Sequence, residues 1–261
     1  MPRAIQTVSG FFTAAGAGTN VATPAPGDTF NVPSFDINNR ARFLQAYASG
    51  ATTDFVRVRS PRMHDANQGL RLRVGTTLDA ELLPWQVSEV LYPSDTPIVE
   101  IDATGAGTGA ILAHYEFDDL PGVSPRLAGL ADIQSRLIHI MGCEVDVTSG
   151  AIGAWGTGVA LNANFDNFEA GADYALLGYE LTTGCHGIAV TGKDTGNLKI
   201  GGPGNVDPRW TSDYFIYMSE QTGRSCIPII AANNKSSTLL QNVDIAAGTA
   251  SKVTLLLGQL A

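Results

Sequence analysis

The stretch Phe55-Val56-Arg57-Val58-Arg59 alternates apolar and basic side chains, and Leu70-Arg71-Leu72-Arg73-Val74 repeats the pattern. Alternation with a period of two is typical of a β-strand with one face in a protein core and the other in solvent. Residues 98–102 alternate in the same way. The arginines within each pair are two residues apart and are therefore expected on one strand face.

Other segments extend this β-rich pattern over the rest of the chain. Residues 214–218 and 252–257 are rich in β-forming side chains, and turn signals stand at 183–184, 194–196 and 201–204. Many short strands separated by turns predict a sandwich or a barrel. One exception is residues 77–83, where Thr77 could cap a short helix before Pro84.

Similar segments recur in the same order in the two halves of the chain. Residues 8–18 resemble residues 148–158, with glycines at matching positions. Five further matches follow at offsets of 140–144 residues: 27–30 with 171–174, 55–61 with 197–203, 83–84 with 227–228, 101–102 with 243–244, and 107–108 with 248–249. The repeat predicts an internal duplication.

The predicted fold is all-β, with two tandem eight-stranded jelly-roll barrels. The first barrel is expected over residues 1–119 and the second over residues 140–261, joined by a connector at 120–139. Prolines and a glycine make the start of this connector turn-rich. The apolar residues that follow predict a short helix, or a helix whose end has already become a strand.

The charge of the chain is low and unevenly distributed. Its 261 residues include 16 basic and 25 acidic side chains, so the net charge is −9, and only 16% of residues are charged. A soluble domain has about 25% charged residues, so this surface is expected to be covered by neighbours. An acidic total disfavours packaging of nucleic acid, and no direct sequence-specific contact with nucleic acid is expected.

Motifs for catalysis and cofactor binding are missing from the sequence. It has no phosphate-binding loop, no nucleophile elbow and no H-E-x-x-H or C-x-x-C pair, and its four histidines are isolated. We therefore expect a protein that is not an enzyme and has no cofactor. The three cysteines, Cys143, Cys185 and Cys226, predict buried free thiols rather than a disulfide framework.

One acidic segment allows a metal-binding hypothesis. Asn162, Asn164, Asp166 and Glu169 space oxygen atoms as calcium prefers, but the segment lacks the glycine and terminal glutamate of an EF-hand loop. A strand edge entering a turn has the same composition.

A β-rich chain of two consecutive similar barrels without catalytic motifs resembles the double jelly-roll major capsid proteins. This lineage includes the coats of small corticovirus-type bacteriophages and the adenovirus hexon. The resemblance is architectural, covers nearly the whole chain and carries over no functional residue. It implies a virion protein, assembled in the host cytoplasm, that forms homotrimers of pseudo-hexagonal outline in an icosahedral shell. The partners implied are other copies, neighbouring trimers, and an internal membrane or minor capsid proteins.

The basic residues near the start suggest where subunits meet. The first 75 residues carry a net charge of +4 and the remainder −13. We predict that Arg57, Arg59, Arg71 and Arg73 meet acidic groups of an adjacent subunit, with Asp118, Asp119 and Glu116 as the first candidates. Headgroups of an internal membrane are an alternative target, and a solvated sheet face is the simplest alternative.

Two other functions fit an all-β chain. A phage or cell-surface adhesin would bind glycans by stacking them on exposed aromatic rings, for which Trp85, Trp155 and Trp210 are the candidates. A glycoside hydrolase would need two carboxylates facing each other across a cleft.

Overall fold

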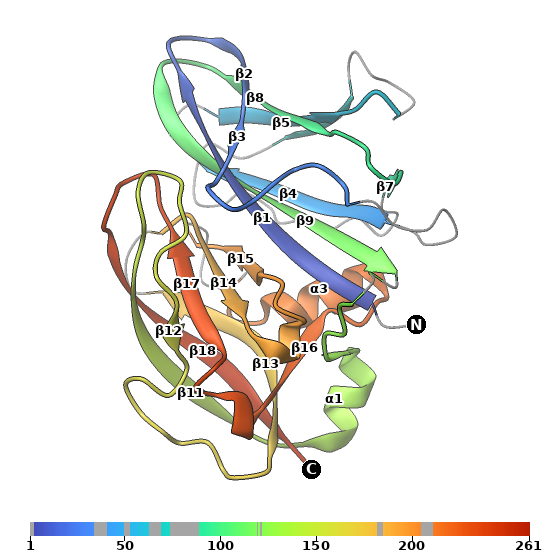
Figure 1. Ribbon diagram of the computed structural model, residues 1–261, viewed down its shortest axis with the longest axis vertical. Helices are drawn as coiled ribbons and strands as arrows, with labels where there is room; N and C mark the ends of the chain where they lie inside the picture. Colours follow the sequence, from blue (N-terminus) through green and yellow to red (C-terminus); the bar gives the residue numbers. More distant parts are fainter. Residues whose placement is uncertain are drawn as a thin grey trace.

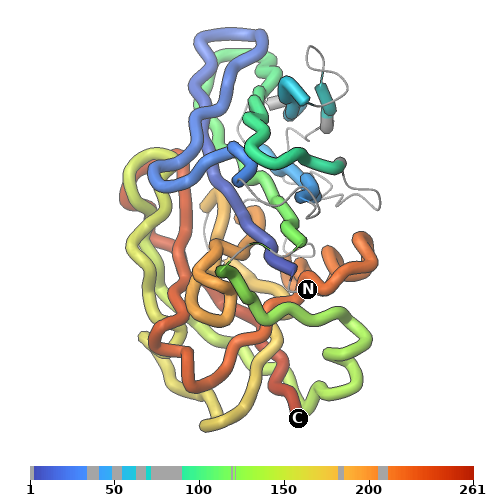
Figure 2. Tube along the Cα trace, turned by 45° about the vertical axis from the view of Figure 1, so that its right-hand side comes forward, coloured from blue at the N-terminus to red at the C-terminus, as the bar shows by residue number. Residues whose placement is uncertain are grey.

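The computed structural model describes residues 3–33, 41–49, 53–62, 69–73, 89–118, 120, 122–181, 185–204 and 211–261. Strands in this part of the chain form four antiparallel sheets, two in each half of the sequence. Figure 1 shows the first half in the upper part of the molecule and the second half below it, with the paired strands β1 and β9 running side by side at the boundary. The N-terminus lies beside this junction and the C-terminus at the far end of the second half (Figure 2).

The first unit contains nine strands in two sheets. They are β1 (Arg3–Ala14), β2 (Gly18–Val21), β3 (Thr23–Pro24), β4 (Ala41–Ser49), β5 (Thr53–Arg59), β6 (Leu70–Arg73), β7 (Glu89–Leu91), β8 (Ile98–Ala103) and β9 (Gly107–Asp118). One sheet has the order β3-β1-β9-β4-β7 and the other β2-β8-β5-β6.

The second unit contains nine strands and the helices of the described chain. They are β10 (Leu127–Ala128), α1 (Leu130–Arg136), β11 (Leu137–Thr148), β12 (Val159–Ala160), β13 (Asp173–Leu181), β14 (Gly187–Thr191), η1 (Lys193–Thr195), β15 (Ile200–Pro203), α3 (Tyr214–Thr222), β16 (Ile227–Ala231), η2 (Ala232–Asn234), β17 (Leu239–Val243) and β18 (Ala250–Leu260). The sheet orders are β10-β16-β13-β18-β11 and β12-β17-β14-β15.

Both units have the same topology. When the two-residue strands β3 and β10 are left out, each unit has eight strands. If these are numbered 1 to 8 in chain order within each unit, one sheet has the strand order 1-8-3-6 and the other 2-7-4-5. Two sheets that exchange successive strands in this way form a jelly roll. The predicted all-β fold of two tandem eight-stranded jelly rolls is confirmed.

Each barrel has its own apolar core between its two sheets. Val56 and Val58 of β5 are fully buried in the first core, while Arg57 and Arg59 between and after them face outward. The predicted alternation is therefore confirmed in β5. In the second barrel, Val253, Leu255 and Leu257 of β18 point inward and have no exposed surface.

The residue matches that suggested a repeat are mostly misplaced. Residues 8–14 lie in β1, but 149–158 follow β11, the counterpart of β1. Likewise, residues 55–59 lie in β5, whereas 200–203 form β15, the counterpart of β6.

Only the last two matches fall on equivalent elements: 101–102 and 243–244 in β8 and at the end of β17, and 107–108 and 248–249 at the turns into β9 and β18. The match of residues 27–30 with 171–174 does not fall on equivalent elements, because 27–30 precede β4 while 173–174 begin its counterpart β13. The match of residues 83–84 with 227–228 is not tested, because 83–84 lie outside the described residues. The offset between the first residues of equivalent strands varies from 130 for β6 and β15 to 143 for β9 and β18, because the loops differ in length.

The predicted strand at residues 214–218 is wrong, because these residues begin the helix α3. Its β-forming side chains suit a helix here because Tyr214, Phe215 and Met218 fall on one helical face and are buried. The helix ends at Gly223, which adopts a left-handed conformation with φ of 62°. Tertiary burial outweighs strand propensity at this position.

The predicted turn at 201–204 is also wrong, since β15 runs through it. Gly201 is needed in this strand because a Cβ there would lie 1.8 Å from the carbonyl oxygen of Ile188 in the neighbouring strand. Glycine within a strand can mark the close approach of another backbone rather than a turn.

The connector contains a helix that becomes a strand, as the second alternative predicted. α1 ends at Arg136 and β11 begins at the next residue. β10 pairs with β16, and Ile133 of α1 is buried in the second core, so this segment packs on the second barrel. The helix predicted at 77–83 and the turn at 183–184 lie outside the described residues. No helix in the described residues is long and apolar enough to cross a membrane.

Candidate assembly surfaces

The two barrels join through a buried contact between sheet faces. The outer face of β1, β9 and β4 in the first barrel lies against β14, β15 and α3 of the second. A Cβ at Gly187 of β14 would lie 2.6 Å from Leu112 Cδ1, so a larger residue here would require the Leu112 side chain of the first barrel to move. Ile5, Leu44 and Tyr47 of the first barrel belong to the second core. The chain is therefore one two-barrel body.

His114 lies at the centre of this junction, with no exposed surface. Its Nδ1 is 3.1 Å from Thr7 Oγ1, and its Nε2 is 3.1 Å from the Tyr214 hydroxyl on α3. A neutral imidazole offers one donor and one acceptor, so these two contacts satisfy it. Burial lowers the pKa of His114 to about 3, which keeps the ring neutral at physiological pH.

Thr7 links the edges of two sheets across the junction. Its amide donates to the carbonyl of Lys199 over 2.7 Å, and its hydroxyl accepts from the amide of Gly201 over 2.9 Å. The open edge of β1 at this point is thus covered by β15. Covering a sheet edge removes a row of unpaired backbone groups that could recruit another chain.

Two buried carboxylates complete the junction. Asp28 of the first barrel accepts from Trp155 Nε1 at 2.7 Å and pairs with Lys199 Nζ at 2.5 Å, both from the second barrel. Glu116 of β9 is 2.7 Å from the guanidinium of Arg224, which follows α3. Glu116 is 2% exposed, so its predicted contact with an adjacent subunit is wrong.

Arg57 and Arg59 share one carboxylate on the outer face of the first barrel. Their guanidinium groups lie 2.7 and 2.9 Å from the oxygens of Glu100 on β8, and the Glu100 side chain is 5% exposed. The hydrogen bond from Arg59 is the main cause that holds the pKa of Glu100 below its usual range. The predicted sharing of a strand face by this arginine pair is confirmed.

Arg71 extends the same face along β6. Its guanidinium is 2.7 Å from Asp102 and lies 4.4 Å from the centre of the Phe55 ring. Burial raises the pKa of Asp102, but hydrogen bonds from Thr19 and Arg71 outweigh it, so the net shift is downward. The Arg71 side chain is 51% exposed. The side chain of Arg73 lies outside the described residues.

The acids predicted to meet these arginines lie elsewhere. Asp118, at the end of β9, is 3.5 Å from Arg3 of the same chain, and Asp119 lies outside the described residues. The arginines therefore find carboxylates within their own sheet. A role for Arg57, Arg59, Arg71 and Arg73, or for Asp118 and Asp119, between subunits stays a prediction.

The calcium candidates each contact a protein group. Asp166 pairs with Lys235, Asn164 donates to Asp146 at 3.0 Å, and Glu169 accepts from Gln259 at 2.6 Å. Asn162 hydrogen-bonds to Asp166. Among the described residues, no group of three or more His, Cys, Asp or Glu side chains is placed to hold a metal ion. Calcium binding stays a prediction.

The other candidate residues occupy structural positions. Trp155 is half-buried at the junction, where its ring NH is bonded to Asp28, so its polar edge is not free to bind a sugar. Trp85 and Trp210 lie outside the described residues. All three cysteines are buried and unpaired, as predicted, and burial raises the pKa of the Cys185 thiol to about 12.

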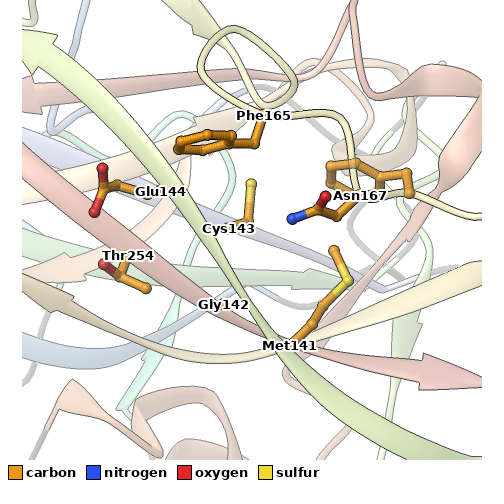
Figure 3. Close-up of a pocket in the computed structure, with 8 residues that line it drawn as sticks. Met141, Gly142, Cys143, Glu144, Phe165, Asn167 and Thr254 are labelled. Atoms are coloured by element: carbon orange, nitrogen blue, oxygen red, sulfur yellow. The ribbon is translucent and has the colours of Figure 1, made fainter.

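A second outer face, on β11 and β18, was missed by sequence reasoning. Ile140 is 58% exposed, and Glu144, Asp146, Lys252 and Thr254 follow it along the two paired strands. Beside it, a pocket of about 230 Å³ lies under the Phe165 ring, between β11 and the loop that carries Asn167 (Figure 3). The apolar run at residues 137–141 was the signal in the sequence.

Comparisons with known proteins found similar solved structures. The major capsid protein P2 from bacteriophage PM2 is 10% identical, with a TM-score of 0.24, over 99% of this chain and 98% of that one. The STIV MCP is 9% identical, with a TM-score of 0.20, over 98% of this chain and 88% of that one. A structure of Sulfolobus Turreted Icosahedral Virus is 9% identical, with a TM-score of 0.19, over 100% and 91%. No family model and no curated protein matched. The assignment of two jelly rolls rests on the strand order of this chain itself.

Proposed function

We propose that this chain is the major capsid protein of a virus, a structural subunit that assembles with copies of itself into a closed shell. The observation that carries the proposal is the pair of jelly rolls with identical strand order, joined by a buried junction. Such a body presents two similar building blocks in a fixed relation. Three copies would supply six blocks around a ring, which gives a homotrimer of pseudo-hexagonal outline.

The surface supports a role in assembly rather than catalysis. Only 16% of residues are charged, which suits extensive contact with neighbours. In the proposed virion, neighbouring trimers complete an icosahedral shell, and an internal membrane or minor capsid proteins contact it from within. Assembly in the cytoplasm of a bacterial host belongs to the same proposal.

The test is the assembly state of the purified chain. Light scattering should give a particle of three times 27.4 kDa, and electron microscopy should show hexagonal outlines or closed shells. A monomer that persists at high concentration would contradict the proposal. A monomer that also binds glycans would favour the adhesin instead.

A further inference from the structure

The four sheets form a stack whose two end faces carry different charges. Within one chain, the order is β2-β8-β5-β6, then β3-β1-β9-β4-β7, then β12-β17-β14-β15, and finally β10-β16-β13-β18-β11. The two inner sheets meet at the junction. Among the described residues, no other sheet packs on the outer sides of the first and last sheets, with β5 and β8 at the upper end in Figure 1 and β11 and β18 in the lower half.

We define the arginine face as the outer side of β8, β5 and β6. It carries three arginines, Arg57, Arg59 and Arg71, and two carboxylates, Glu100 and Asp102. Positive charge is in excess on this face. Arg71 is the most exposed of the three arginines, and the other two are partly exposed.

We define the acidic face as the outer side of β11 and β18 with the adjoining end of β13. Glu144 and Asp146 of β11 lie opposite Thr254 and Lys252 of β18, and Glu180 of β13 is opposite Thr254 on its other side. Asp146 and Glu180 are exposed. Lys252 pairs with Glu144 at 2.9 Å, so negative charge is in excess. Ile140 adds exposed apolar surface at one end.

These two faces are the counterparts of the two that already meet inside the chain. The junction joins the β1-β9 face of the first barrel to the β14-β15 face of the second. By strand order, β11 and β18 correspond to β1 and β9, and β5 and β6 correspond to β14 and β15. In the described part of the chain, each half of the junction therefore has one counterpart face on which no other sheet packs, and these two faces lie at opposite ends.

We propose that the acidic face of one copy packs on the arginine face of the next, repeating the internal junction between chains. The contact is head-to-tail, and such contacts form a closed ring when the rotation between copies closes. Opposite net charges orient the two faces, and the exposed Ile140 adds apolar area to be buried. This inference rests on the proposed function and names the surfaces that the trimer would use.

Charge reversal on the acidic face tests the proposal. Asp146→Arg changes an exposed side chain, and the trimer dissociation constant should rise about tenfold or more, because like charges would then face each other. The matched control is Glu220→Arg on α3, an exposed acid away from both faces, which should leave the constant unchanged. Circular dichroism checks that both variants fold.

A compensating change shows which face lies opposite. Arg71→Glu alone should also weaken the trimer, and adding it to Asp146→Arg should recover a measurable part of the lost association. Two results would overturn the face assignment alone, provided that the wild-type chain is trimeric. One is an unchanged trimer dissociation constant in Asp146→Arg, and the other is a double variant whose trimer dissociates more readily than that of either single variant. A wild-type chain that stays monomeric would instead overturn the proposed function.

Cross-linking provides a measurement that does not depend on affinity. Arg71→Lys places an amine on the arginine face, and a zero-length carbodiimide should join it to Glu144 or Asp146 of another copy. Mixing ¹⁴N- and ¹⁵N-labelled chains identifies links between copies by their mixed mass. Links from position 71 only to Asp102 of the same chain, in a sample that is trimeric, would contradict the proposed contact.

Discussion

The two outer faces of the first barrel differ in the charge and the exposure of their polar groups. The centre of the β1-β9-β4 face meets the second barrel through the neutral polar groups Thr7, His114 and Gln45, all of which are at most 2% exposed. The charged group of this face, Glu116, is buried in an ion pair with Arg224. The arginine face, on the other sheet, has charged groups that solvent still reaches. A permanent contact excludes water and suits neutral groups with satisfied hydrogen bonds, while an exposed face tolerates charge at little cost. The difference teaches that the centre of the buried contact uses neutral groups, and that a carboxylate buried beside it is held in an ion pair.

The largest effect should come from removing the centre of the junction. His114→Ala leaves a cavity and removes one hydrogen bond from each of Thr7 and Tyr214, so the free energy of unfolding should fall by about 2–4 kcal/mol. His139→Ala, at an exposed position, is the control and should change stability by less than about 0.5 kcal/mol. Urea denaturation measures both. Equal stabilities would show that the junction does not depend on this ring.

The same residue should make stability depend on pH. The unfolded histidine binds a proton near pH 6.5, but the folded ring does so only near pH 3, so acid favours the unfolded state. Stability should therefore fall by about 1.4 kcal/mol for each pH unit from pH 6.5 down to about pH 3, from this group alone. Subtracting the profile of His114→Gln isolates the contribution. If the free energy of unfolding changed with pH by the same slope in both proteins, the folded ring would bind a proton over the same pH range as the unfolded one.

A smaller effect is expected on the arginine face. Glu100→Gln removes the charge that holds Arg57 and Arg59, and the free energy of unfolding should fall by about 1–2 kcal/mol at pH 7. The folded pKa of Glu100 is lowered, so this stability is present above its unfolded pKa and disappears as pH falls through the folded value. Thermal melts of both proteins at pH 7 and pH 3 should therefore differ less at the lower pH. A difference at pH 3 as large as the one at pH 7 would assign the loss to packing.

The smallest effect should come from the most exposed pair. Arg71→Gln breaks the contact with Asp102, but the arginine is half-exposed, so we expect a loss of about 0.5 kcal/mol or less. Added salt should reduce the difference further. If the loss of stability were as large as that of Glu100→Gln, the exposed pair of Arg71 with Asp102 would stabilise the fold as much as the buried Glu100 does.

Sequence reasoning succeeded where a strand has one charged side and one apolar side. In β5, Val56 and Val58 enter the core and Arg57 and Arg59 face out, so the local pattern contains the answer. It failed at α3, because Tyr214 and Phe215 favour strands intrinsically and only packing against the rest of the molecule makes them helical. It also misplaced most of the repeat, because loops of unequal length hide the equivalence of strands.

The junction could not be predicted from any local pattern. Of its central groups, His114 is 107 residues from Thr7 and 100 residues from Tyr214 in the chain, and the three meet only in the folded molecule. Glu116 illustrates the same limit, because an acid near the end of a strand is usually solvated but here is buried against Arg224. The acidic face was missed because its exposed isoleucines are typical of a core strand.

The pairing of β1 with β9 has a consequence for biosynthesis. These strands hold Arg3 opposite Asp118, so the first barrel closes once the ribosome has made little more than its own length. Its junction face, however, waits for Gly201 and Tyr214, which emerge roughly a hundred residues later. At about 5–20 residues per second, a nascent chain displays that face uncovered for roughly 5–20 s. During this interval, the half-made protein presents to the cell the surface that the finished molecule never exposes.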